Sequence, residues 1–328
     1  MPSRPLLSGA LLSGALLSGA LLVAALLAAP AEAQRLRADG PPVRLDVGVA
    51  PAAHPLFSPD GAYVAFSRPD YAGLWVAPAA GGAARRLTGA PGARFGAAFS
   101  PDGARLVART SRYDGPTRYL AVTVFDVASG TAEPLTDERT HLPDLPRWAD
   151  AAHVVLRQDG AAQVFPVAGG LAPPSAVAFA PVPGGFARLE AATGRAETIR
   201  PAVPGLEPDA MLLNLTVSPD GERVAFEVLG DGLYVCRTDG SEVRALGRGE
   251  RPAWSPDGRW LAVMLTEDDG HHLTGADLYA VSADGAQRVR LTATPDRLEM
   301  NPAWSPDGRF VAYDDAADGA LYLLPVRE

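Results

Sequence analysis

The tetrapeptide Ser-Pro-Asp-Gly occurs five times in this chain of 328 residues, each time directly after an apolar or aromatic residue. Its serines are Ser58, Ser100, Ser218, Ser255 and Ser305. In such a tetrapeptide proline presets its backbone angle, serine bonds back to the backbone, and glycine takes the left-handed conformation. We therefore expect each copy to be a tight link between two antiparallel strands.

Short apolar runs follow each tetrapeptide, as at residues 63–66 and 310–313, and such β-rich runs bounded by turn residues indicate buried strands. In four copies an alanine stands seven residues after the serine: Ala65, Ala225, Ala262 and Ala312. A small residue at a fixed position of a strand indicates crowding, as where several sheets converge on one axis.

A third run and a more polar fourth run complete most repeats. Leu233-Tyr234-Val235 is typical of the third run, and Leu87-Thr88 is a typical end of the fourth, with a glycine-containing turn between the two runs. Four antiparallel strands in a unit of about 40 residues are the blade of a β-propeller. The predicted fold class is therefore an all-β propeller.

The spacing of the serines bears on the number of blades. Ser58 and Ser100 are 42 residues apart, but Ser100 and Ser218 are 118 apart, which is too long for one blade. Residues 147–156 resemble a worn copy of the repeat, and residues 179–185 resemble another. The first copy alone gives six blades, whereas both give seven. The length of the chain favours seven, with six as the alternative.

The propeller needs a device to close its ring. The chain ends within a predicted strand at residues 321–326, with no fourth strand after it, and residues 43–47 form a spare strand before the first repeat. We predict that these two segments pair, which removes an exposed sheet edge. A single propeller domain then spans residues 43–328, after a short linker at residues 34–42.

The N-terminal residues are typical of a secretory signal. Arg4 precedes an apolar run at residues 6–29, and Ala31-Glu32-Ala33 matches a small-residue cleavage site. The sequence therefore predicts a signal peptide at residues 1–33 and a periplasmic or secreted protein with no stable membrane insertion after cleavage. The run is also close to the length that spans a bilayer, so an uncleaved anchor is the alternative.

Charge and cysteine content exclude several classes of protein. The net charge of −9 argues against nucleic acid and anionic membrane surfaces as general partners. Cys236 is the only cysteine, so no internal disulfide forms, and we expect it to be a small buried apolar residue. The sequence indicates no cofactor, and we expect a monomer.

The repeated Ser-Pro-Asp-Gly, the Leu-Tyr-Val strand and the Leu-Thr ending resemble the propeller repeat of TolB proteins, periplasmic members of the Tol–Pal envelope system. The repeat is also similar to those of prolyl oligopeptidase-like enzymes and oligogalacturonate lyases. TolB proteins carry an α/β domain before the propeller, and the peptidases carry a hydrolase domain after it. We expect neither domain here, and the part after residue 33 has no G-x-S-x-G motif. This resemblance is specific for fold rather than function.

One end of the predicted propeller carries the functional candidates. The tight turns share one end of the blades, whereas the longer loops between second and third strands, and those between blades, share the other. Loops on a rigid scaffold are where binding usually occurs. We call this second end the variable-loop face. Its candidate binding residues are Arg68, Tyr71, Arg112, Tyr113, His141, Arg251, His271 and His272.

No pattern of residues indicates catalysis or a metal centre. Residues 267–272, Glu-Asp-Asp-Gly-His-His, contain metal-ligating types, but adjacent histidines in an extended loop tend to point apart. The repeated aspartates of the tetrapeptides are better interpreted as turn formers than as calcium ligands, because each stands alone in its turn. We therefore predict no catalytic residue and no metal ligand.

Two functions remain open from the sequence. The first is a non-enzymatic exported propeller that binds a protein or peptide, or acts as a scaffold, in the cell envelope through the variable-loop face. The alternative is a carbohydrate-active enzyme similar to the oligogalacturonate lyases, which uses the histidines, arginines and acidic residues of the loops.

Overall fold

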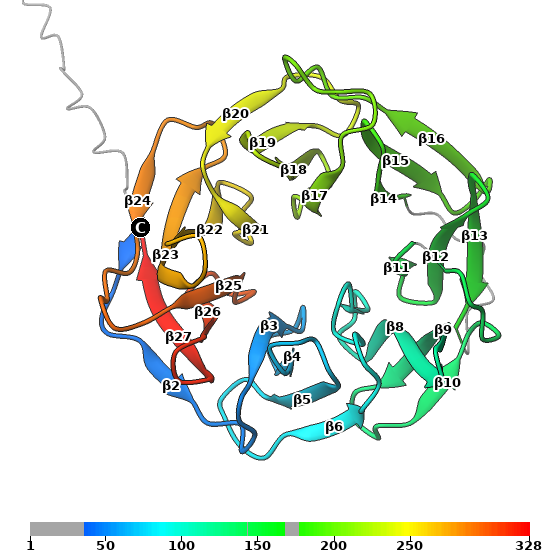
Figure 1. Cartoon of the computed structure of the whole chain (residues 1–328), viewed down its shortest axis with the longest axis horizontal. Coiled ribbons are helices and arrows are strands. Elements are labelled where there is room, and N and C mark those ends of the chain that lie inside the picture. The colour runs from blue at the N-terminus through cyan, green and yellow to red at the C-terminus, as the bar shows by residue number, and fades with distance from the viewer. Residues whose placement is uncertain (1–35, 143, 168–176) are drawn as a thin grey trace, which may run out of the picture. The chain divides into compact units, whose positions relative to one another are not determined.

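The computed structural model describes residues 36–142, 144–167 and 177–328, and the predicted signal peptide lies outside these ranges. All strands of the described residues belong to seven antiparallel sheets arranged as blades in a ring (Figure 1). The favoured prediction of a seven-bladed propeller is therefore confirmed, and the alternative of six is not. No helix among the described residues is long and apolar enough to cross a membrane.

Five blades contain the Ser-Pro-Asp-Gly turn between their first and second strands. Blade 1 contains β3 (Ala53–Phe57), β4 (Tyr63–Ser67), β5 (Leu74–Pro78) and β6 (Arg85–Thr88), and blade 2 contains β7 (Ala98–Phe99), β8 (Arg105–Asp114), β9 (Thr117–Asp126) and β10 (Ala132–Pro134). Blade 5 contains β17 (Leu212–Val217), β18 (Arg223–Val228), β19 (Gly232–Arg237) and β20 (Arg244–Gly247), and blade 6 contains β21 (Glu250–Trp254), β22 (Trp260–Asp268), β23 (Leu273–Ser282) and β24 (Arg288–Arg290). Blade 7 contains β25 (Glu299–Trp304), β26 (Phe310–Asp315) and β27 (Ala320–Arg327) from the end of the chain.

The two worn copies of the repeat form the remaining blades. Blade 3 contains β11 (Arg147–Asp150), β12 (His153–Gln158) and β13 (Ala161–Pro166), and blade 4 contains β14 (Val177–Val182), β15 (Gly185–Glu190) and β16 (Arg195–Ile199). In blade 3 the Asp150 carboxylate accepts a hydrogen bond from the amide of Ala152 at 2.8 Å. It also forms a hydrogen bond with the Nδ1 atom of His153. A side chain therefore still organises the turn, although the proline and glycine are absent.

The N-terminal strand closes the ring as predicted. β2 (Val43–Leu45) pairs with β27, with Val43 opposite Leu323 and Leu45 opposite Leu321, and so supplies the outer strand of blade 7. A second short strand, β1 (Arg37–Ala38), pairs with the far end of β27. β1 lies within the residues that were expected to form a linker.

The Ser-Pro-Asp-Gly turns share one hydrogen-bond pattern, shown here for the first copy. The Ser58 hydroxyl accepts from the amide of Tyr63 at 2.9 Å and donates to the Asp60 carboxylate. Gly61 has φ of +72° and donates its amide to the Ser58 carbonyl at 2.9 Å. Each aspartate is thus a turn former, as the sequence indicated.

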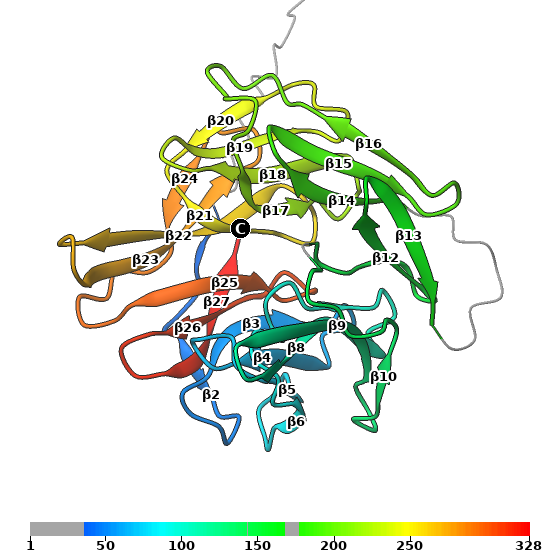
Figure 2. The ribbon, with the colours of Figure 1, turned by 45° about the vertical axis from the view of Figure 1, so that its right-hand side comes forward.

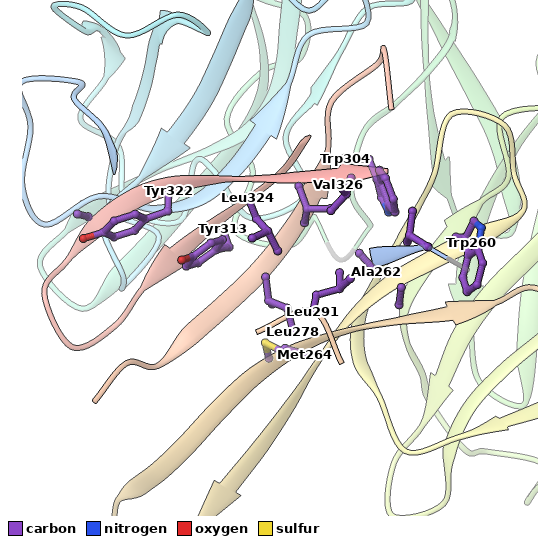
Figure 3. Close-up of a cluster of buried hydrophobic side chains, with 14 residues drawn as sticks. Trp260, Ala262, Met264, Leu278, Leu291, Trp304, Tyr313, Tyr322, Leu324 and Val326 are labelled. Atoms are coloured by element: carbon purple, nitrogen blue, oxygen red, sulfur yellow. The ribbon is translucent and has the colours of Figure 1, made fainter. Parts of the chain in front are cut away.

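A separate apolar core fills each of the seven contacts between neighbouring blades in the described part of the chain. Figure 3 shows the core between blades 6 and 7, where Trp260 and Met264 face Trp304 and Tyr313. The alanines seven residues after the serines are fully buried in these cores: Ala65, Ala225, Ala262 and Ala312. These alanines thus lie inside the contacts between blades, and the crowding that the sequence indicated there stays a prediction.

Candidate functional site

A residue with positive φ marks the same position at or just before the start of the innermost strand in five blades. It precedes the serine of the tetrapeptide by four residues and has φ between +49° and +72°. The five are His54, Gly96, Asn214, Arg251 and Asn301. In the four non-glycine cases the strand pairing shifts register at this point, which makes a bulge. Left-handed non-glycine residues are uncommon and gather at functional sites, where the surrounding contacts maintain them.

Side chains nine residues after the serine hold these bulges and link one blade to the next. Asp314 of blade 7 accepts a hydrogen bond from the His54 amide of blade 1 at 2.9 Å. Glu227 of blade 5 accepts from the Arg251 amide of blade 6 at 2.6 Å. Each carboxylate also accepts from the bulge asparagine of its own blade, Asn301 and Asn214 respectively. The strained backbone is therefore fixed on both sides.

Burial governs the ionisation of these two carboxyl groups. Asp314 is 4% exposed, and loss of solvation raises its pKa to about 7. Burial likewise raises the pKa of Glu227, which is 8% exposed. Both carboxyl groups accept hydrogen bonds, which offset part of the free-energy cost of burying them.

Five side chains from two blades and the loop after blade 1 meet on the variable-loop face, and we call them the axial cluster: His54, Tyr71, Arg94, Phe95 and Arg251. The rings of His54 and Tyr71 are 3.7 Å apart between centroids, and the Phe95 ring meets Tyr71 edge-on at 5.4 Å. Arg251 comes from blade 6, two blades away, and its guanidinium lies 6.0 Å from the centre of the Tyr71 ring. Because Arg251 is on an innermost strand, this contact lies where the blades converge (Figure 1).

The axial cluster is cationic and partly desolvated. Burial, reinforced by the charges of Arg94 and Arg251, lowers the pKa of His54 to about 3, so its imidazole is neutral at pH 7. Burial, reinforced by the charge of Arg251, lowers the pKa of Arg94 to about 10, although Tyr71 and Asp314 act in the opposite sense. Phe95 is 43% exposed at the edge of this group. The arrangement offers aromatic rings and guanidinium groups rather than an acid–base pair next to a nucleophile.

Two of the sequence-predicted residues therefore meet at the axis, and a third lies beside one of them along the chain. Tyr71 and Arg251 belong to the axial cluster, and Arg68 lies in the same turn as Tyr71, whose amide donates to the Arg68 carbonyl at 2.9 Å. Tyr71 has φ of +60°, and its hydroxyl is buried without a hydrogen-bond partner among the described residues.

Blade 2 carries three other predicted residues on the long β8–β9 hairpin and the loop after β10. The Arg112 guanidinium makes two hydrogen bonds to Glu138, at 3.0 and 2.7 Å, and lies 4.8 Å from the Tyr119 ring centre. It borders a surface hollow of about 290 Å³. Tyr113 is 54% exposed at the hairpin tip, and His141 is exposed. Arg112 thus fastens the hairpin to its neighbouring loop.

The two remaining predicted residues lie at the tip of the β22–β23 hairpin, which projects from the ring in Figure 2. His271 and His272 are exposed, and both donate their amides to the Asp269 carboxylate, at 2.9 and 2.7 Å. In the described ranges no three His, Cys, Asp or Glu side chains are grouped so that they could hold a metal ion.

Sequence reasoning did not select His54, Arg94 or Phe95. A usable signal was present for His54, because it stands at the same distance before its serine as Arg251 and the two bulge asparagines. Arg94 and Phe95 lie in the loop between blades 1 and 2, where the repeat provides no fixed position.

The comparisons with known proteins agree with the fold. No family model matches the sequence, and no curated protein is similar to it in sequence. The structure is similar to a putative TolB from Agrobacterium tumefaciens, with 18% identity over 84% of this chain and 89% of that chain, at a TM-score of 0.49. It is also similar to the C-terminal WD40 domain of Sif2, with 11% identity, 84% and 81% coverage and a TM-score of 0.53. The β-propeller domain of Cps50 (Swd1) from Myceliophteria thermophila has 11% identity, 89% and 100% coverage and a TM-score of 0.53.

At these identities the likeness is one of fold. The chain is a seven-bladed β-propeller whose variable-loop face carries an aromatic and cationic cluster at the axis.

Proposed function

We propose that this protein is an exported β-propeller that binds a protein or peptide partner at the axial end of its variable-loop face. The observation that carries this proposal is the contact of Arg251 with Tyr71, which brings two distant blades to one point. A rigid ring with side chains converging at its centre favours recognition, because little ordering is needed on binding.

The composition of the axial cluster supports a protein partner. Tyrosine, arginine and phenylalanine are enriched at protein interfaces, and tyrosine and arginine often supply most of the binding energy. Phe95 exposes 43% of its surface while the neighbouring Tyr71 is largely covered, so an apolar contact surface remains available. The net charge of −9 makes nucleic acid an unfavourable partner.

Export and a role in the cell envelope belong to the proposal and rest on the sequence of residues 1–33. Fractionation of cells that express the full chain tests them. Recovery of the shortened protein in the periplasm or medium is expected, whereas a full-length cytoplasmic protein would reject export.

A photo-crosslinking amino acid at Phe95 tests the binding proposal. The matched control carries the same group at Ala80, which is exposed in the turn between β5 and β6 on the opposite face. We expect a defined partner to be captured from Phe95 and not from Ala80, and the purified partner to bind again in isolation. Equal capture from both positions would reject a role for the variable-loop face.

The carbohydrate-enzyme alternative stays a prediction, because no contact among the residues that the structure describes favours it. The exposed His271 and His272 are held in the β22–β23 turn by backbone hydrogen bonds: both amides donate to the Asp269 carboxylate, and the His272 carbonyl accepts from the Asp269 amide at 3.1 Å.

A further inference from the structure

Two guanidinium groups of the axial cluster have no ion-pair partner among the described residues. Arg94 donates to the carbonyl oxygens of His54 and Pro55, at 2.9 and 3.4 Å, and to no carboxylate. Arg251 lies over the Tyr71 ring, and no carboxylate within the described ranges is at ion-pair distance from it. Ten other arginines of the described ranges pair directly with an aspartate or glutamate, whereas the charges of Arg94 and Arg251 stay unpaired at one point of the axis.

The acidic groups that face this cluster are already engaged by backbone amides. Glu227 accepts from the Arg251 amide, and Asp314 accepts from the His54 amide. Asp70 accepts from the amide of Ala72 at 3.0 Å. These carboxylates hold the local backbone, and none of them ion-pairs with either guanidinium.

Resting on the proposed function, we propose that the bound segment of the partner is an acidic peptide that presents a carboxylate to Arg251 and an apolar side chain to Phe95. A guanidinium binds a carboxylate through two parallel hydrogen bonds, and such bonds are strongest where water is partly excluded. The Phe95 ring lies 5.4 Å from the Tyr71 ring, and the Arg251 guanidinium lies 6.0 Å from the centre of the same ring, so both groups of the ligand are recognised within one short span.

This geometry selects a ligand with an anionic and an apolar group close together. In a peptide these groups belong to adjacent residues, such as phenylalanine followed by glutamate. The carboxylate comes either from an acidic side chain or from the C-terminus of the chain, and the two sources share the same chemistry.

The test uses the dipeptide acetyl-Phe-Glu as its probe, with binding to the purified protein measured by saturation-transfer NMR. Three related probes keep only the side-chain carboxylate, only the terminal carboxylate, or neither. We expect millimolar binding of at least one acidic probe and at least about tenfold weaker binding of the neutral one. The better of the two single-carboxylate probes identifies the source of the carboxylate.

Variants locate the site. Arg251→Gln should weaken acetyl-Phe-Glu at least about tenfold, because one charge-assisted pair is lost. Arg44→Gln removes the same charge from the exposed strand β2 and should leave binding within about twofold. Phe95→Ala, at a solvent-exposed position, should also weaken the probe severalfold without affecting folding.

Equal binding of the acidic and neutral probes would overturn the inference, as would unchanged binding by Arg251→Gln or no detectable binding of any probe. The proposed function has a separate outcome. A partner captured at Phe95 that binds Arg251→Gln as tightly as the natural protein preserves the function and rejects the acidic ligand.

Discussion

Asp314 at the junction of blades 7 and 1 gives a pH dependence of stability with a defined sign. Its carboxyl group is buried between the His54 amide and the Asn301 side chain, and burial raises its pKa to about 7. In the unfolded chain an aspartate ionises near pH 4. Between about pH 4 and about pH 7 the folded protein therefore holds a proton that the unfolded chain has released, and the contribution of Asp314 to the unfolding free energy falls as the pH rises.

Asp314→Asn removes this titration with little change of shape. The amide oxygen still accepts from the His54 amide, but the side chain no longer ionises. A difference of one proton changes the unfolding free energy by about 1.4 kcal/mol per pH unit. The unfolding free energy of the variant, measured relative to the natural protein, should therefore rise by about 2 kcal/mol between about pH 5 and about pH 6.5.

Guanidinium denaturation followed by tryptophan fluorescence measures this difference at each pH. The natural protein is the reference, so titrations of other groups cancel. One of these groups is His54, whose pKa is lowered to about 3 in the folded protein. As the pH falls below about 6.5, the unfolded chain binds a proton at His54 before the folded protein does. The contribution of His54 to the unfolding free energy therefore rises with pH, opposite to that of Asp314. A difference between variant and natural protein that stays constant with pH would refute the reasoning, since Asp314 would then titrate alike in both states.

Three further predictions concern the scaffold. Ser218→Ala removes the hydroxyl that accepts from the Arg223 amide at 2.9 Å and should lower the unfolding free energy by about 1–2 kcal/mol, measured by urea denaturation. Leu45→Ala, in the strand that closes the ring, should lower the unfolding free energy by about 2–5 kcal/mol, since Leu45 is 5% exposed in the core between blades 7 and 1. Val43 is 58% exposed on the same strand, so Val43→Ala should lower it by less than about 1 kcal/mol. Equal effects of the two variants would contradict closure by this strand. Cys236 is 1% exposed and burial raises its thiol pKa to about 12, so Ellman's reagent should label no thiol in the native protein and one in denaturant; rapid native labelling would contradict its burial.

The repeat made the fold predictable because its signals are local. A Ser-Pro-Asp-Gly turn contains all the groups that it needs, as the bonds around Ser58 show, so sequence alone places each hairpin. The buried Ala65 and its counterparts depend only on the distance from that turn. Closure by residues 43–45 was also predictable, since the last blade lacked an outer strand.

Other elements could not be predicted, because their local sequence signals are weaker. Strand β1 (Arg37–Ala38) is only two residues long and exists because β27 extends far enough to pair with it. The turn of blade 3 depends on Asp150 and His153, whose contact is specific to that blade.

The candidate site was predictable only in part, because its residues are distant in sequence. Tyr71 was selected as an aromatic candidate and Arg251 as an arginine candidate of the loops. Their contact follows from the circular arrangement of the blades, which brings blade 6 close to blade 1 at the axis. Arg112 was selected for the same reason, and yet its guanidinium is committed to Glu138. The type of a side chain and its place in a loop thus predict poorly whether it is free to bind a ligand, because residues that pair with it, such as Glu138, come from elsewhere in the chain.

Hydrogen–deuterium exchange on the partner complex tests the central claim most directly, which is that ligands bind at the axis on the variable-loop face. We use the partner captured at Phe95 and compare the free and bound protein. We predict slower exchange in residues 68–73, 92–97 and 249–252, which surround the axial cluster. Protection confined to the Ser-Pro-Asp-Gly turns, such as residues 58–61 and 305–308 on the opposite face, would contradict it.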